Sequence, residues 1–179
     1  VKDVTHKQFY WYQTNVLITR FLSSCGVGEV IDFMPVGLSA RERGYHWLIR
    51  RVRVIRCTMD FCLKCHPAFN YARDRHQTTI TDVGAYFESS GLNLALVTEI
   101  PLQQDNNGVF AKFTLEAGEE AVFVLRQIDS TSDCGLPLNC NEAQDLFKHT
   151  VDYWRSWLSK CKYKGRWREM VERSALVLK

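Results

Sequence analysis

Residues 45–56 read YHWLIRRVRVIR, and this stretch decides the fold class. Val52 and Val54 alternate with Arg51 and Arg53, so apolar and charged side chains face opposite ways. A period of two residues is that of a strand with one buried face. The same period recurs, bounded by turn residues, over 15–22, 29–35, 58–65, 77–83, 92–99, 109–115 and 121–128. Strands in this number with short connections predict a mainly β protein, an antiparallel β-sandwich.

One of these connections is a polar turn. It reads QQDNNG at 103–108 and lies between the strands predicted at 92–99 and 109–115. Gly108 is available there for a positive φ, because glycine has no Cβ to clash. Turns of this kind join antiparallel neighbours, as a sandwich requires.

After Ile128 the apolar period changes to three or four residues, which predicts helices. Asn141 is the expected cap of the first, with Gln144 at the third position of a box-like arrangement. One stripe of this helix is apolar. Its members are Ala143, Leu146, Phe147, Val151, Trp154, Trp157, Leu158 and Cys161.

A second helix is expected after Gly165. It runs to Lys179 with no Gly, Asn or Pro to end it, which predicts that the chain is a piece of a longer protein. Its apolar face comprises Trp167, Met170, Val171, Ser174, Ala175 and Leu178. The chain thus divides into an N-terminal β-domain at 1–140 and a helical part at 141–179.

Composition and charge exclude several classes. The 179 residues allow one domain, or one domain plus a fragment, and 46% hydrophobic content excludes a disordered chain. No apolar run approaches the roughly 18 residues of a membrane helix, so we expect no membrane partner and a cytoplasmic location. The net charge of +3 specifies no partner. Six Arg between 41 and 56 could serve a nucleic-acid surface, but no RNP-type aromatics, zinc finger or basic zipper accompany them, so no nucleic-acid partner is expected.

The seven cysteines raise the question of a metal site. Cys62, Cys65 and His66 have ligand-like spacing, with Cys57 just upstream. A zinc site needs four converging ligands, and a strand would place Cys62 and Cys65 on opposite faces. We therefore expect reduced, mostly buried thiols, no metal and no cofactor.

Catalytic signals are few. The sequence contains no phosphate loop, dinucleotide fingerprint, nucleophile elbow or His-Glu-x-x-His, and its spacing singles out no pair of catalytic carboxylates. Three residues remain as candidate saccharide contacts. Trp11 lies in the aromatic cluster 9–12, which could stack on sugar rings or pack in the core; Trp47 is a further aromatic; Asp32 ends a strand, where it could line a site or cap a turn. The charged run 73–76 could bind an anion or be a solvated loop.

Several strings taken together resemble one family. They are TNVLITRF (14–21), EVIDFMPV (29–36), RRVRVIR (50–56), PAFNYARDRH (67–76), FVLRQ (123–127) and YWRSWLSKCKYKGRWREMVERSALVLK (153–179). In this order they resemble glycoside hydrolase family 15, and within it the glucoamylase- and trehalase-like proteins. The resemblance covers essentially the whole chain.

The resemblance implies a two-domain enzyme. An N-terminal β-sandwich would be joined by a linker helix at 141–162 to an (α/α)6 barrel, whose first helix would be 166–179. Two Glu of the barrel would hydrolyse α-glucosidic bonds with inversion, and neither has a counterpart here, so no catalytic residue is assigned. The implied partners are the barrel and the α-glucoside or α-glucan substrate of the parent enzyme.

Two alternatives to this assignment stay open. The chain could be a stand-alone carbohydrate-binding or protein-interaction module, in which Tyr10, Trp11, Tyr12 and Trp47 would contact the ligand. It could also form a homo-oligomer, because a helical end without its partner helices would expose Trp154, Trp157, Trp167, Met170 and Val171.

Overall fold

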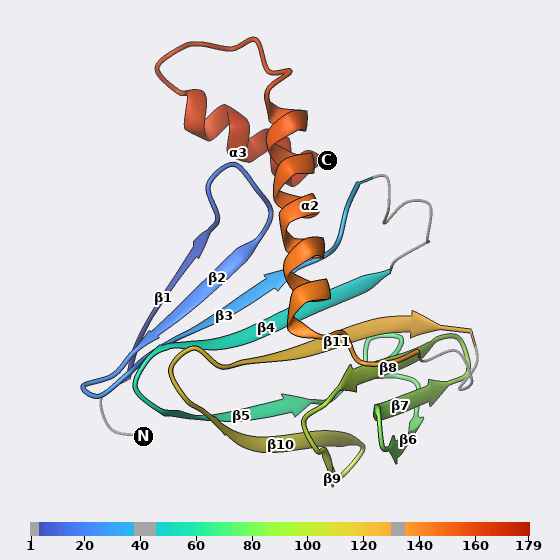
Figure 1. Ribbon diagram of the computed structural model, residues 1–179. Coiled ribbons are helices and arrows are strands. Elements are labelled where there is room, and N and C mark those ends of the chain that lie inside the picture. The colour runs from blue at the N-terminus through green and yellow to red at the C-terminus, as the bar shows by residue number, and fades with distance from the viewer. Residues whose placement is uncertain (1–3, 38–45, 130–134) are drawn as a thin grey trace.

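The computed structural model describes residues 4–37, 46–129 and 135–179 (Figure 1). Its strands are β1 (Thr5–Tyr10), β2 (Leu17–Leu22), β3 (Val27–Phe33), β4 (Trp47–Arg56), β5 (Met59–Cys65), β6 (His76–Thr81), β7 (Gly84–Ser89), β8 (Asn93–Thr98), β9 (Gln103–Asp105), β10 (Gly108–Leu115) and β11 (Glu120–Ile128). Its helices are α2 (Cys140–Leu158) and α3 (Arg168–Leu178).

The strands form two antiparallel sheets. Within the described residues, one sheet has eight strands in the order β1-β2-β3-β4-β11-β8-β7-β6, and the other has three in the order β5-β10-β9. The main core lies between them, with Val54, Phe87 and Phe123 from the large sheet meeting Phe61 and Val109 from the small one. The predicted antiparallel β-sandwich followed by two helices is confirmed.

Strand β4 shows how the alternation of the sequence builds two cores. Val52 and Val54 are buried in the core between the sheets, whereas Ile49 is buried on the opposite face under α2. Arg51 lies on that second face and is only 4% exposed, and Gln144 of α2 accepts a hydrogen bond from it. The charged face of this strand is therefore covered by α2 at Arg51, whereas Arg53 on the same face keeps 39% of its side chain exposed.

Helix α2 connects the sandwich to α3. Ala143 and Val151 pack on the large sheet, while Trp154 and Leu158 pack against Leu176 of α3. Figure 1 shows α2 rising from the strands β4 and β11 to α3, which lies beside the connection between β1 and β2. The C-terminal helices are thus attached to the sandwich at two places. The predicted division into 1–140 and 141–179 stays a prediction.

Three strands, β1, β7 and β9, lie outside the predicted ranges. All six side chains of β1 are exposed, so its sequence THKQFY carries no apolar alternation. The three residues of β9 come from the predicted turn at 103–108, which is therefore shorter than expected. The left-handed residue of that turn is Asn106 (φ 53°) and not Gly108. Gly108 is required for a different reason, since a Cβ there would lie 2.4 Å from the carbonyl oxygen of Cys65.

The cap of α2 is Asn139 and not the predicted Asn141. The Asn139 side chain accepts from the backbone N–H of Glu142, and the Glu142 carboxylate accepts from the backbone N–H of Asn139, each at 3.0 Å. An anionic box partner also interacts favourably with the N-terminal end of the helix dipole. Gln144, the predicted box partner, instead accepts a hydrogen bond from Arg51 at 2.8 Å.

Helix α3 buries a different face from the predicted one. Its buried side chains are Glu172 and Leu176, whereas Trp167 and Met170 are 54% and 65% exposed. Trp154 of α2, expected at the exposed end, is buried. Neither described helix combines the length and apolar character that crossing a membrane would require.

Candidate functional site

The connection between β1 and β2 is a tight turn that presents polar atoms to α3. Gln13 has a φ of 59°, and the buried hydroxyl of Thr14 donates to the carbonyl of Trp11 at 2.8 Å. The same hydroxyl accepts from the backbone N–H of Val16 at 3.1 Å. Because these bonds fix the turn internally, the outward groups of residues 13–15 hold a defined position.

Arg173 and Asn15 lock this turn to α3. The Asn15 amide donates to the carbonyl of Leu176 at 2.8 Å, and the Arg173 guanidinium donates to the carbonyl of Thr14 at 2.9 Å and to the side-chain oxygen of Asn15. The guanidinium carbon also lies 4.1 Å from the ring centroid of Tyr10. A charged donor, an amide and an aromatic face thus join parts of the chain about 160 residues apart.

Glu172 is the third side chain that joins the β1–β2 turn to α3, and its carboxylate is buried. The contacts of Asn15, Glu172 and Arg173 between this turn and α3 are called the lock below. Gln13 donates to one carboxylate oxygen at 3.1 Å and Arg168 to the other at 2.7 Å. The hydrogen bond from Gln13 lowers the pKa of Glu172, and the bond and charge of Arg168 lower it further against the opposing effect of burial. The carboxylate is therefore ionised at neutral pH and held in place.

Above this lock lies a depression of about 270 Å³. Its wall comes from residues 10–13 on one side and from Glu169, Glu172, Arg173 and Leu176 of α3 on the other. Positions 169, 172, 173 and 176 share one helix face, because their spacings are three and four residues. The depression therefore lies at the junction of the sandwich with the helical part.

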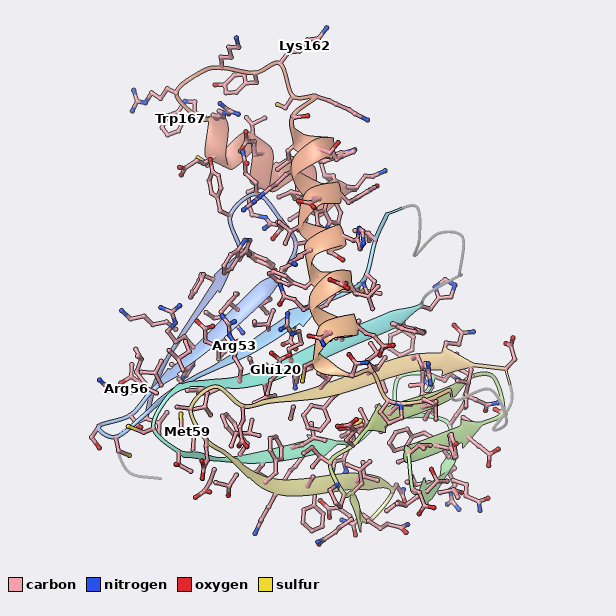
Figure 2. All side chains as sticks on the ribbon, viewed as in Figure 1. Arg53, Arg56, Met59, Glu120, Lys162 and Trp167 are labelled. Atoms are coloured by element: carbon pink, nitrogen blue, oxygen red, sulfur yellow. The ribbon has the colours of Figure 1, made fainter. Side chains whose placement is uncertain are left out.

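A second polar cluster holds the base of α2. Arg51 donates to both carboxylate oxygens of Glu120, at 2.5 and 2.8 Å, and to Gln144. Its guanidinium carbon lies 5.6 Å from the ring centroid of Phe147. Arg53, labelled with Glu120 in Figure 2, instead donates to Glu29, which also accepts from Arg20. Burial by itself would raise the pKa of Glu29, but the bonds from Arg53 and Arg20 outweigh it and lower the pKa.

The structure does not bring the three candidate saccharide contacts together. Trp11 lines the depression at α3 and rests edge-on against Phe147, with ring centroids 5.8 Å apart. Trp47 packs against the core under α2, with the guanidinium of Arg126 5.2 Å from its ring centroid. Of the three, only Trp11 lies beside α3.

Asp32 lies in a separate groove. Arg50 donates to its two carboxylate oxygens at 2.7 and 2.9 Å, so the side chain is paired in place of capping a turn. This groove, about 370 Å³, runs between strands β1–β4 and the strand β5. The carboxylate and the guanidinium already satisfy each other there.

The loop at 67–76 is held by aromatic packing and by a hydrogen bond. His76 lies between Phe69 and Phe87, with ring centroids 5.0 and 6.1 Å away, and its Nε2 is 2.6 Å from the carbonyl oxygen of Asn107. Asn70, Tyr71 and Ala72 all have a left-handed φ, and Tyr71 is 91% exposed at the tip.

The cysteines that the structure describes are all free thiols, but they are not mostly buried. Cys25, Cys57, Cys62 and Cys140 are exposed, and Cys65 and Cys161 are half-buried; Cys134 lies outside the described residues. On β5, Cys62 is exposed while Cys65 packs against the main core, as the alternation predicts. Burial raises the pKa of the Cys65 thiol, which therefore stays protonated at neutral pH.

The helical end carries apolar side chains in solvent. Trp167, Met170, Val177 and Leu178 of this end are each more than half exposed. Figure 2 shows Trp167 at the outer end of the helical part, remote from the sheets. Positions 167, 170, 174 and 177 share a face that is rotated away from the one on the β1–β2 turn. These exposed large side chains form an apolar patch on one face of the helical end.

Fold and site together define a class of protein: a β-sandwich domain with a helical extension. Hydrogen bonds and the partly buried Glu172 ion pair hold the extension to the domain. No family profile matches the chain. Its sequence is 31% identical to the trehalase of Thermoplasma acidophilum over an alignment of 188 residues. The alignment covers 99% of this chain and 30% of that protein. The chain is 29% identical to the trehalase of Thermoplasma volcanium, with 99% and 28% covered, and 27% identical to that of Mycobacterium tuberculosis, with 75% and 20% covered.

These similarities show that the chain is homologous to a part of these trehalases. The chain spans less than a third of the trehalases that it matches. Among solved structures, a putative kojibiose phosphorylase from the human microbiome shares 9% identity at a TM-score of 0.46, with 98% of this chain and 25% of that one covered. The assignment to family 15 stays a prediction.

The sequence singled out Trp11, with Tyr10 and Tyr12 beside it, but not the other residues that line the depression or hold its two sides together. Gln13, Asn15 and Arg173 carried no signal, because their function depends on a contact between distant parts of the chain. Arg168 and Glu172 are four residues apart, a spacing typical of helical ion pairs, and this signal could have been used.

Proposed function

We propose that the chain is the non-catalytic N-terminal domain of an enzyme that hydrolyses α-glucosidic bonds, with trehalose as its substrate. The homology to trehalases supports the reaction class. The catalytic groups would lie in an (α/α)6 barrel of which α3 is the first helix. The role of the β-sandwich is to hold that helix in position.

The observation that carries this proposal is the two-sided character of α3. One side, with Glu172 and Leu176, is fixed to the sandwich and α2. The other side exposes Trp167 and Met170. A helix that ended the structure would have a polar outer face, whereas an apolar outer face fits further helices packed against it. A cytoplasmic location fits the free thiols and is part of the proposal.

The first test is activity. The purified chain, incubated with trehalose and with maltooligosaccharides, is expected to release no glucose, because no catalytic carboxylate pair is assigned to it. Glucose release above the level of a heat-denatured control would contradict the proposal.

The second test uses a chimera. In the Thermoplasma acidophilum trehalase, the region aligned with this chain is replaced by the chain itself. We expect trehalose hydrolysis by this chimera and its loss in the same chimera carrying Trp167→Asp, since a charge would be buried at the helical contact. Tyr71→Asp, on the exposed loop of the sandwich, is the matched control and should stay active. Equal activity of the Trp167 and Tyr71 variants would show that this face contacts no partner.

The exposed face also predicts behaviour of the isolated chain. We expect binding of an apolar dye and weak self-association in ultracentrifugation, both reduced by Trp167→Ser combined with Met170→Ser. The single change Tyr71→Ser serves as control because Tyr71 is still more exposed, at 91%, but lies on the sandwich. A monomer without dye binding would be evidence against the partner face.

A further inference from the structure

The depression between the β1–β2 turn and α3 has the makings of a ligand site that no catalytic role requires. Tyr10 and Tyr12 are 50% and 65% exposed at its wall, whereas Trp11 between them is half-buried. Leaving two large rings in solvent forgoes the stabilisation that their burial would give. Flat aromatic faces in solvent beside a hollow are suited to stacking on a ring-shaped ligand.

The rim of the depression supplies hydrogen-bonding groups. Glu172 accepts one hydrogen bond at each oxygen, from Gln13 and Arg168, and a carboxylate has about four acceptor positions. Glu169 is exposed one helical turn before it, on the same face. Two carboxylates and an amide can therefore accept from and donate to several hydroxyl groups at once.

The local charge selects a neutral ligand. Glu169 and Glu172 contribute two negative charges, and Arg168 and Arg173 contribute two positive ones. These four charges sum to zero, so the depression has no net charge to attract an anion. A cation would compete with Arg173, which already lies 4.1 Å from the Tyr10 ring centroid.

The volume limits the size of the ligand. At about 270 Å³ the depression is slightly below the roughly 300 Å³ at which small-molecule sites begin. That space suits one six-membered ring and not a chain of rings. A pyranose has this size, is neutral, and combines an apolar face of C–H groups with a rim of hydroxyls.

We propose that Tyr10, Tyr12, Gln13, Glu169 and Glu172 bind one pyranose unit of a neutral saccharide. The ring stacks on Tyr12 and meets Tyr10 away from the face that Arg173 occupies, and its hydroxyls donate to the two carboxylates. The site is separate from the apolar outer face of α3, so partner helices docked there leave it open. It does not depend on the proposed catalytic role, because binding is measured on this chain alone.

The test is a titration of the whole chain with methyl α-glucoside, trehalose and maltose, followed by calorimetry and by NMR amide shifts. We expect a Kd on the order of 1 to 10 mM, since only one ring is held, and shifts confined to residues 10–13 and 168–176. Tyr12→Ala should weaken binding at least tenfold; the side chain is exposed, so the fold is expected to survive, and a melting curve checks it. Tyr71→Ala should leave binding unchanged.

Three results would overturn the proposal. One is the absence of heat and of amide shifts at 100 mM sugar, about ten times the weakest Kd expected. Another is shifts at the groove beside Asp32 instead of at the tyrosines. The third is tighter binding of choline than of methyl α-glucoside, which would make the depression a cation site. Loss of trehalase activity in the chimera would leave these outcomes unaffected, so the two proposals fail separately.

Discussion

The β-sandwich and the helical end are stabilised in different ways. Between the sheets, Phe87 and Phe123 are buried in the main apolar core. At the helical end, α3 is held by Arg173, Asn15 and Glu172 while its Trp167 lies in solvent. Apolar burial dominates between the sheets, whereas α3 combines the packing of Leu176 on Trp154 and Leu158 with polar contacts and leaves an apolar side uncovered. The two regions thus differ in how much of their apolar surface is covered.

The comparison is tested most strongly by truncating an aromatic in each region. Phe123→Ala should lower the free energy of unfolding by about 3 to 5 kcal/mol, because it leaves a cavity in the main core. Trp167→Ala should change it by less than about 1 kcal/mol, since the ring has little to lose. Urea unfolding followed by circular dichroism measures both. Similar losses would mean that the two regions are equally packed.

Two neighbouring arginines on β4 give the next largest effect. Arg51→Ala should cost about 3 kcal/mol or more, because it leaves Glu120 without its partner beneath α2. Arg50→Ala removes an ion pair of the same geometry with Asp32, but Arg50 is half exposed, so its loss should cost at most about 1 kcal/mol. The same unfolding experiment compares them. If both variants lose the same free energy of unfolding, the burial of Arg51 under α2 does not make its ion pair more important for stability.

A smaller and more local effect is expected from the lock. Arg173→Ala should lower the local stability of α3 by about 1 to 3 kcal/mol, because the carbonyl of Thr14 and the side chain of Asn15 lose a charged donor. Hydrogen exchange should then accelerate at residues 168–178 and stay unchanged in β4 and β11. Arg166→Ala, which removes only a contact with the exposed Trp167 ring, is the control. Uniform acceleration across both regions would argue against a separate lock.

The smallest expected difference between the two regions is in how their stability depends on pH in the acid range. The pKa of Glu172 and that of Glu29 are lower in the folded chain than their usual value near 4.5. Their stabilisation is therefore complete above that value and disappears as the pH falls through the folded pKa. Glu172→Gln should flatten the acid dependence of exchange in α3, and Glu29→Gln should flatten that of global unfolding. Unchanged pH profiles in both variants would refute the assignment.

Most of the sandwich could be predicted because buried faces leave a period of two in the sequence. The alternation at Val52 and Val54, and at Val109 and Ala111, corresponds to side chains buried between the sheets. Strand β1 was not predicted because both of its faces are exposed. Its backbone pairs with β2, and this pairing leaves no apolar pattern in the sequence. A strand that is specified by its neighbour cannot be recognised from its own residues.

The candidate site was predicted only in part, for a related reason. Trp11 stands out by residue type, but its place beside Glu172 and Arg173 results from a contact across some 160 residues. Trp47 and Asp32 have suitable chemistry for saccharide binding, yet one packs against a core and the other is paired with Arg50. Residue type indicates what a side chain can bind, while its neighbours decide whether it is available.

The sequence by itself determined the β-sandwich, the change to helices after Ile128 and the apolar character of the C-terminal end. These properties depend on local periodicity, which every part of the chain carries with it. Only the tertiary structure decided that Arg51 is buried under α2, that Asn139 caps this helix, and that the β1–β2 turn holds α3. These are contacts between distant segments, and their energies depend on burial and distance, which exist only in the folded chain.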